Sequence, residues 1–125
     1  ISVRTFLLVG PPFIPEKEQA KWVNQSIEVA FEAGSNVVSF IPTHSGNGAL
    51  DELLRNGEFC EPNLCDLEAA QEFGLGLKAG RVFADTWDAR RFSKCSHCAG
   101  ERVARLERMN LSQMSEPGTE CICGG

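Results

Sequence analysis

The sequence predicts an α/β fold: a three-stranded parallel βαβαβ fragment followed by a C-terminal helix and a cysteine-rich tail. Three apolar runs of strand length, at residues 3–9, 36–41 and 81–87, end at turn-forming residues. Helical patterns separate these runs, and strands joined by right-handed helical crossovers pair in parallel. We expect the crossover helices to cover both faces of the sheet. The 125 residues, 42% of them hydrophobic, suffice for one domain, or for one domain with a small appendage.

The first half of the chain is predicted to form one β-α-β unit. Its first strand stops at Gly10-Pro11-Pro12, and the helix that follows has Pro15 in its first turn and ends at Gly34. The second strand then covers residues 36–41. Apolar residues at helical spacing predict the buried face of the helix: Ala20, Val23, Ile27, Ala30 and Phe31.

The second half of the chain is predicted to add three helices and the third strand. A short helix covers residues 49–56, and another covers residues 62–73 with Gly74 as its stop. The strand at 81–87 follows, and the last helix covers residues 99–112. The side chains of this last helix that we expect to face inward are Val103, Leu106 and either Met109 or Leu111.

Four cysteines in the tail predict a metal site. They occur as two close pairs, Cys95-x2-Cys98 and Cys121-x-Cys123, and each pair can clamp one edge of a tetrahedron. Zinc is the metal that this set of ligands favours, and an iron-sulfur cluster is the alternative. Ordinary thiols or disulfides are the third interpretation. The two remaining cysteines are predicted to be core or loop residues: Cys60 and Cys65.

The formal net charge of −5 is unevenly distributed along the chain. Residues 1–89 carry 6 basic and 13 acidic side chains, whereas residues 90–108 carry 6 basic and 2 acidic ones. A solvated helix face paired with Glu101 and Glu107 is the commoner explanation of this basic segment. Contact with nucleic-acid phosphates or with a protein partner is the other interpretation. The residues expected to make the contact are Arg102, Arg105 and Arg108.

Candidate ligand-binding residues follow the strands, because parallel α/β folds bind ligands at the carboxyl ends of their strands. The loop after the second strand contains His44, Gly46 and Gly48, and its glycines permit close approach of the backbone to an anion or nucleotide. His44 could act as a base or as a contact residue, but a lone histidine in a loop is more often structural, and we expect that role for it. Asp85 and Asp88 could act as an acid and a base, although Asp88 could equally cap a turn.

The sequence also indicates a compartment. No apolar run approaches membrane-spanning length, so we expect no membrane partner. The start, Ile1-Ser-Val-Arg, lacks the pattern of a signal peptide and enters a strand almost at once, which predicts a fragment of a longer protein. Cysteines gathered in a ligand-like cluster favour a reducing, cytoplasmic location.

Four segments, taken in their order and spacing, resemble the C-terminal part of a radical SAM family. They are Phe6–Phe13 (FLLVGPPF), Val37–Thr43 (VVSFIPT) with Gly46-Asn-Gly48, Gly80–Trp87 (GRVFADTW), and Cys95-x2-Cys98 with Arg102 and Arg105-Leu106. The family includes the beta subunit of archaeosine synthase and its bacterial relatives, and it is distantly related to the elongator-type tRNA enzymes. The resemblance covers nearly the whole chain.

The resemblance implies a fold, a cofactor and a substrate class. Residues 1–88 would be the closing portion of a partial (β/α) barrel whose earlier strands lie outside this chain, and residues 89–125 a basic helix with the cysteine-rich tail. The family's Cys-x3-Cys-x2-Cys loop, which holds a [4Fe-4S] cluster, does not occur in this sequence, so the fragment would not cleave S-adenosylmethionine alone. A tRNA or another nucleic acid is the implied substrate. The implied contacts of S-adenosylmethionine are Ile41, Pro42, Thr43 and Asn47.

Two other interpretations remain open at this point. The chain could be a non-catalytic, zinc-stapled α/β module that binds RNA or a protein partner, or a complete flavodoxin-like domain. A three-stranded fragment of a barrel would expose apolar sheet edges and faces, so we expect the isolated chain to self-associate.

Overall fold

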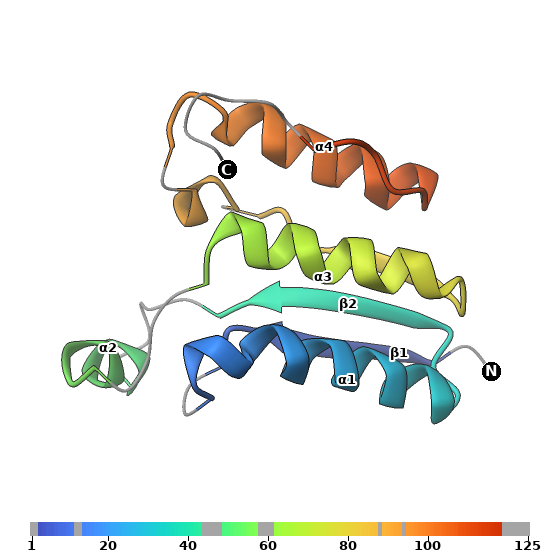
Figure 1. The fold of residues 1–125 in the computed structure, drawn as a ribbon, viewed down its shortest axis with the longest axis horizontal. Helices are drawn as coiled ribbons and strands as arrows, with labels where there is room; N and C mark the ends of the chain where they lie inside the picture. Colours follow the sequence, from blue (N-terminus) through green and yellow to red (C-terminus); the bar gives the residue numbers. More distant parts are fainter. Residues whose placement is uncertain are drawn as a thin grey trace.

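The computed structural model describes residues 3–11, 14–43, 49–57, 62–87, 89–93 and 95–118. The fold is mixed α/β, with a three-stranded parallel sheet in the order β1-β2-β3 and helices packed against it (Figure 1). The strands are β1 (Arg4–Val9), β2 (Val37–Pro42) and β3 (Arg81–Ala84). The predicted α/β class and the parallel pairing of three strands are therefore confirmed.

The strands pair in a simple register, in which Arg4 lies opposite Val37 and Val37 lies opposite Arg81. Strand β3 is shorter than the predicted 81–87, because the chain turns immediately after it. The Asp85 Oδ1 atom accepts a hydrogen bond of 3.0 Å from the Trp87 backbone N–H, and such a turn ends the extended conformation.

The helices follow the predicted order. They are α1 (Gln19–Glu32), α2 (Ala49–Arg55), α3 (Leu64–Leu77) and α4 (Ala99–Ser112), with short 3-10 turns at Glu16–Glu18 and Ala89–Phe92. Helix α1 buries Val23, Ile27 and Ala30, as its apolar stripe predicts, but Ala20 is exposed and Phe31 is only half-buried. In α4, Met109 is fully buried and Leu111 is 85% exposed, so Met109 is the inward residue of that pair.

Helix α3 does not stop at Gly74, contrary to the prediction. Gly74 lies inside the helix and faces β3, where a Cβ atom would lie 3.0 Å from Val82 Cγ1. Its missing side chain therefore permits close packing of the helix on the strand rather than ending the helix. The helix begins with a capping box between Asn63 and Asp66 and ends at Lys78, whose φ is 51°.

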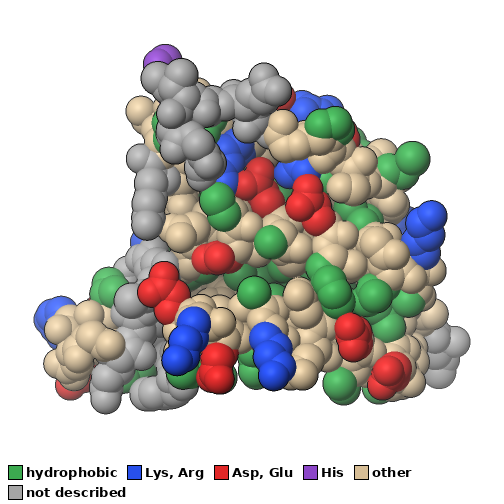
Figure 2. Space-filling view, in the orientation of Figure 1, with side chains coloured by type: hydrophobic (Ala, Val, Ile, Leu, Met, Phe, Trp, Pro, Cys, Tyr) green, Lys and Arg blue, Asp and Glu red, His purple; other side chains and the backbone are tan. Residues whose placement is uncertain are grey.

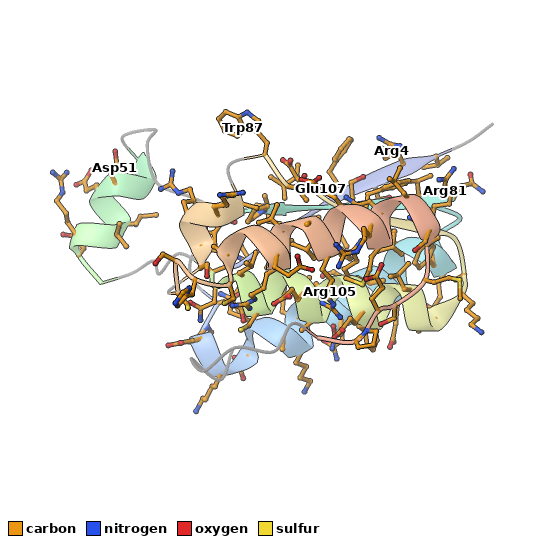
Figure 3. All side chains as sticks on the ribbon, turned by 90° about the horizontal axis from the view of Figure 1, so that it is seen from above. Arg4, Asp51, Arg81, Trp87, Arg105 and Glu107 are labelled. Carbon is orange, nitrogen blue, oxygen red and sulfur yellow. The ribbon has the colours of Figure 1, made fainter. Side chains whose placement is uncertain are left out.

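Helices α1 and α3 lie side by side on one face of the sheet, so the prediction that crossovers cover both faces is wrong. Each strand pairs with the one before it, and successive right-handed crossovers then place every helix on the same side. The core contains alternate strand residues such as Val38, Phe40 and Val82. Figure 3 shows Arg4 and Arg81 on the opposite side of the sheet, away from α1 and α3.

Helix α4 lies beside α3 and closes the outer edge of β3 (Figure 1). Gln113, just after the helix, accepts a 2.7 Å hydrogen bond from the Val82 N–H and donates one of 2.9 Å to the Val82 carbonyl. Asn110 pairs in the same way with Ala84, at 2.9 Å in both directions. In the described part of the chain, no helix is long and apolar enough to cross a membrane.

Candidate functional site

The residues with predicted functions lie in two regions of the structure: the carboxyl end of the sheet and the interface between α3 and α4. At the carboxyl end, the Thr43 N–H donates to the Val9 carbonyl at 3.0 Å, which extends the pairing of β2 with β1. On the other side of β2, the Asp85 N–H donates to the Phe40 carbonyl at 2.9 Å. Thr43 and Asp85 therefore follow neighbouring strands at one end of the sheet.

Thr43 is the most distinctive residue of this end. It is only 6% exposed, and its buried Oγ1 atom has no hydrogen-bond partner among the described residues. A buried hydroxyl without a partner destabilises a fold by about 1–3 kcal/mol, so most buried hydroxyls are paired. The Thr43 hydroxyl is thus placed to bond a group outside the described residues.

The other residues predicted for this end divide into three groups. Pro42 is buried and Ile41 is half-buried, so both lie beside Thr43 at the strand end. Asp85 is exposed and its carboxylate shapes the turn to Trp87, so its pairing with Asp88 as acid and base stays a prediction. Three predicted residues lie outside the described part: His44, Asn47 and Asp88.

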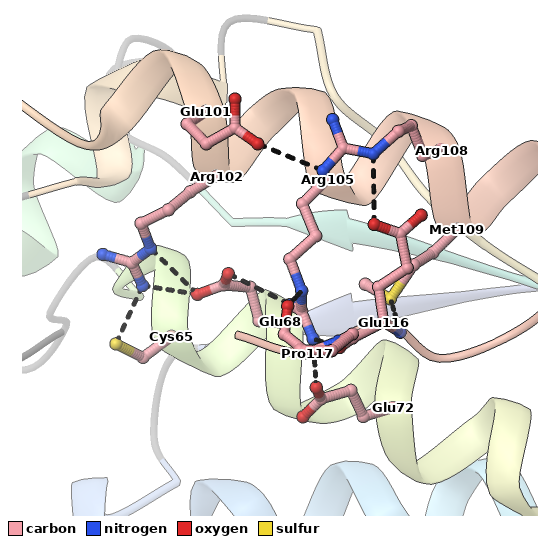
Figure 4. A network of polar contacts seen from close by, with 10 residues as sticks. All are labelled: Cys65, Glu68, Glu72, Glu101, Arg102, Arg105, Arg108, Met109, Glu116 and Pro117. Atoms are coloured by element: carbon pink, nitrogen blue, oxygen red, sulfur yellow. Dashed lines mark hydrogen bonds and ion pairs between the residues drawn. The ribbon is translucent and has the colours of Figure 1, made fainter. Parts of the chain in front are cut away.

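The interface of α3 and α4 corrects the prediction for two of the three arginines. Arg102 is 5% exposed and Arg105 is 2% exposed, so neither guanidinium lies on the surface where a nucleic acid or partner would meet it. Both side chains point from α4 to α3, where Glu68 and Glu72 neutralise them (Figure 4). Buried arginines need such paired carboxylates.

Arg102 is enclosed by one carboxylate and two thiols. Its Nε donates to Glu68 Oε1 at 3.1 Å, and its Nη2 donates to Cys65 Sγ at 3.0 Å and also forms an ion pair with Glu68. Burial alone would lower the pKa of Arg102, but hydrogen bonds to Glu68, Cys65 and Cys98 and the charge of Glu68 raise it above its usual value. Arg102 is therefore a permanent cation between α3 and α4.

Arg105 joins three segments of the chain. Its guanidinium forms ion pairs with Glu68, at 3.3 Å, and with Glu72, both on α3. It also donates to the carbonyls of Glu116 and Pro117, with 2.8 Å between Nε and the Pro117 oxygen. The segment after α4 is thereby held against α3 (Figure 4).

Arg108 is the one member of the predicted trio at the surface. Its side chain is 48% exposed and forms ion pairs of 3.1 Å with both Glu101 and Glu116. Hydrogen bonds to Glu116 and Glu101 raise the pKa of Arg108. Figure 2 shows acidic and basic side chains interspersed over one face of the molecule. A phosphate would compete with two carboxylates for Arg108, and this contact stays a prediction.

The cysteines are only partly described. Cys98 is buried at the start of α4 and hydrogen-bonds Arg102, while Cys95 is half-buried in the preceding turn. Within the described residues, no three His, Cys, Asp or Glu side chains are grouped to hold a metal ion. The predicted ligands Cys121 and Cys123 lie outside these residues, so the metal site stays a prediction. Cys60 also lies outside them, and its prediction as a core or loop residue is not tested.

Sequence reasoning missed the acidic partners and one thiol of this interface. Cys65 lies exposed in the first turn of α3 and bonds Arg102, so its prediction as a core or loop residue is wrong. Glu68 and Glu72 are four residues apart and share one face of α3. Two acids at this spacing on a helix, together with Arg102 and Arg105 three apart on another, are a signal that predicts a paired interface.

Comparisons with models of known protein families, with curated proteins and with solved structures found no match to this chain.

Proposed function

We propose that the chain is the C-terminal part of a radical SAM iron-sulfur enzyme that modifies tRNA or another nucleic acid. It is inactive alone, because its sequence lacks the cysteine triplet that would hold the cluster. The observation that carries the proposal is the one-sided sheet. Helices cover one face, while Phe6 on the other face is 61% exposed and Leu8 is 44% exposed.

A partial (β/α) barrel accounts for this one-sidedness. In such a barrel the helices lie outside and the inner face of the strands is covered by other strands of the same barrel. The order β1-β2-β3, with α1 and α3 on one face, is the arrangement that a segment of a barrel has. Preceding strands of the parent protein would be the first partner of this chain, and they would cover the open face.

The cofactor would lie at the carboxyl end of the strands. Thr43 fits this assignment, because its buried hydroxyl lacks a partner among the described residues and can bond a polar edge of an adenine. Ile41 and Pro42 would supply apolar contacts to the same ring, and Asn47 would complete the set. Bound S-adenosylmethionine would supply the radical chemistry, and the residues of this chain would position it.

The tail would be a structural clamp for α4. Zinc held by Cys95, Cys98, Cys121 and Cys123 would tie the chain end to the start of the helix. The Arg102 guanidinium, which hydrogen-bonds Cys98, suits a thiolate-rich site because it offsets negative charge. Thiolate ligands of this kind persist in a reducing compartment, which fits a cytoplasmic enzyme.

The test uses the full-length parent protein, purified without oxygen. We expect iron and sulfide in the amounts of a [4Fe-4S] cluster, zinc that is lost in the double variant Cys95→Ser, Cys98→Ser, and release of 5′-deoxyadenosine from S-adenosylmethionine on reduction. Thr43→Val should raise the KM for S-adenosylmethionine about tenfold, the effect of one lost hydrogen bond.

The matched control is Thr5→Val, which removes a threonine hydroxyl at the opposite end of the sheet and should leave this KM unchanged. A parent protein without iron that releases no 5′-deoxyadenosine would overturn the assignment.

A second candidate is the non-catalytic module. The ion pairs of Arg102 and Arg105 fix α4 on α3 without any outside partner, so the helix can present Arg108 as a preformed surface. This module would bind tRNA with an affinity that falls with salt and with Arg108→Glu, and it would hold zinc but no iron.

A further inference from the structure

The two outer edges of the sheet differ in their free backbone groups. In a parallel strand, successive residues direct their N–H and C=O groups to opposite sides. The carbonyls of Val3 and Val9 accept hydrogen bonds from Val37 and Thr43, so the odd-numbered residues of β1 face β2. The groups of Arg4, Phe6 and Leu8 therefore point outward, and no described residue bonds them.

The surface around this free edge is apolar on both sides. Phe6 and Leu8 are exposed on the open face of the sheet. On the helical side, an open hollow of about 390 Å³ lies between β1 and α1 and is lined partly by Leu7, Trp22 and Val29. Val29 is 61% exposed. Edge strands are normally protected from pairing by several charged residues, proline or a bulge, whereas β1 has one charged residue, Arg4, and apolar side chains beside it.

We infer that β1 is the surface through which two copies of this chain associate, by antiparallel pairing of β1 with the β1 of the second copy around a two-fold axis. The sealed edge of β3 selects this arrangement. Asn110 and Gln113 occupy the outward groups of Ala84 and Val82, so β1 of one copy has no free β3 edge to join in another. Head-to-tail pairing is thus excluded, and two-fold pairing leaves no free edge.

The charges on β1 agree with this pairing. Arg4 is the only charged residue of the six in β1 and lies at the start of the strand. Antiparallel pairing places the two copies of Arg4 at opposite ends of the joint, so like charges do not face each other. The pairing joins apolar residues, Phe6 and Leu8 among them, and yields a six-stranded sheet from two three-stranded ones. The inference concerns the chain of these 125 residues alone, because in the barrel proposed above a preceding strand of the parent protein would occupy the same edge of β1 in place of the second copy.

The experiment measures the mass of the chain in solution by sedimentation equilibrium and light scattering over a wide range of concentration. We expect a dimer and no larger species. Leu8→Lys should raise the dissociation constant of the dimer at least about tenfold, because it places a charge at the interface between the two β1 strands. Leu111→Lys is the matched control, since Leu111 is also an exposed leucine but lies on α4, and it should leave the constant unchanged.

Hydrogen exchange of the wild-type chain gives a second measurement that needs no variant. The amides of Phe6 and Leu8 should exchange more slowly as the dimer forms, while those of Val82 and Ala84 should be protected at every concentration. A monomer at all concentrations, species that grow beyond the dimer, or a dimer unaffected by Leu8→Lys with unprotected Phe6 and Leu8 amides would each overturn the inference. Weaker dimerisation in Leu111→Lys alone would also overturn it.

Discussion

At the outer edge of β3, the side-chain amides of Gln113 and Asn110 form hydrogen bonds with the outward N–H and C=O groups of Val82 and Ala84. At the outer edge of β1, the corresponding groups of three residues have no partner in the described part of the chain. A side-chain amide carries an NH2 group that donates and a carbonyl oxygen that accepts, so it can replace a neighbouring strand at one residue. Helix α4 thus ends the sheet on one side, while the sheet remains open to a further strand on the other.

The difference also extends to the helical layer. Beside β3, α4 is fixed to α3 by buried ion pairs that involve Arg102 and Arg105. Beside β1, α1 ends the layer with Val29 exposed and a hollow at its flank. The closed edge at β3 therefore depends on polar contacts of α4. Substitutions that remove these contacts should expose the β3 edge, as the β1 edge is already exposed.

The largest effect is expected from Arg105→Ala. The change leaves Glu68 without one of its two arginines and Glu72 without its ion pair, and it releases the segment held through the Pro117 carbonyl. Removing one partner of a buried ion pair costs about 3–5 kcal/mol, so the free energy of unfolding in urea should fall by about that amount. Arg108→Ala, at an exposed site, is the control and should shift the transition little.

If Arg105→Ala and Arg108→Ala lowered the free energy of unfolding equally, the buried ion pairs of Arg105 would not be the contacts that hold α4 beside β3.

Asn110→Leu tests the seal itself. It leaves the N–H and C=O of Ala84 unpaired and removes the acceptor of the Gln71 side chain, which donates to Asn110 Oδ1 at 2.6 Å. We expect a loss of about 2–3 kcal/mol in the free energy of unfolding, because buried polar groups lose their partners. Light scattering should also detect species larger than a dimer, since β3 then offers an edge to β1 of another copy.

An Asn110→Leu variant that lost stability but formed no larger species would show that shape, rather than hydrogen bonding, closes this edge.

Much of this fold could be predicted from the sequence, because its local signals and its tertiary structure agree. Each apolar run that stops at a turn residue is a strand, and the bounds of α4 match the prediction at both ends. Strand β3 is shorter than predicted because the Asp85 carboxylate bonds the Trp87 N–H, and a sequence pattern does not reveal that turn. The one-sided helices follow from strand order, which is a tertiary property.

The candidate site was less predictable from the sequence. A local excess of charge or a glycine-rich loop does not indicate which residues a side chain will contact in the folded protein. A local excess of arginine is typical of a phosphate-binding surface, yet Arg102 and Arg105 face Glu68 from a helix more than 30 residues away in the sequence. Strand order places Thr43 at the carboxyl end of the sheet, but its role as a cofactor contact is implied by the resemblance alone. Its buried hydroxyl, which has no partner among the described residues, is visible only once β2 is placed beside β1.

The smallest expected effect concerns the packing of β3 on α3, and it compares two glycines of one helix. A Cβ atom on Gly74 would lie 3.0 Å from Val82 Cγ1, whereas one on Gly76 would have no atom within 4 Å. Gly74→Ala should therefore destabilise the chain by about 1–2 kcal/mol through overpacking against β3. Gly76→Ala should stabilise it by about 0.5–1 kcal/mol, because alanine favours the helix. Urea unfolding of both variants measures these opposite signs. Equal gains in the two variants would mean that α3 can move away from β3 at no cost, and that the closed side of the sheet owes its stability to α4 alone.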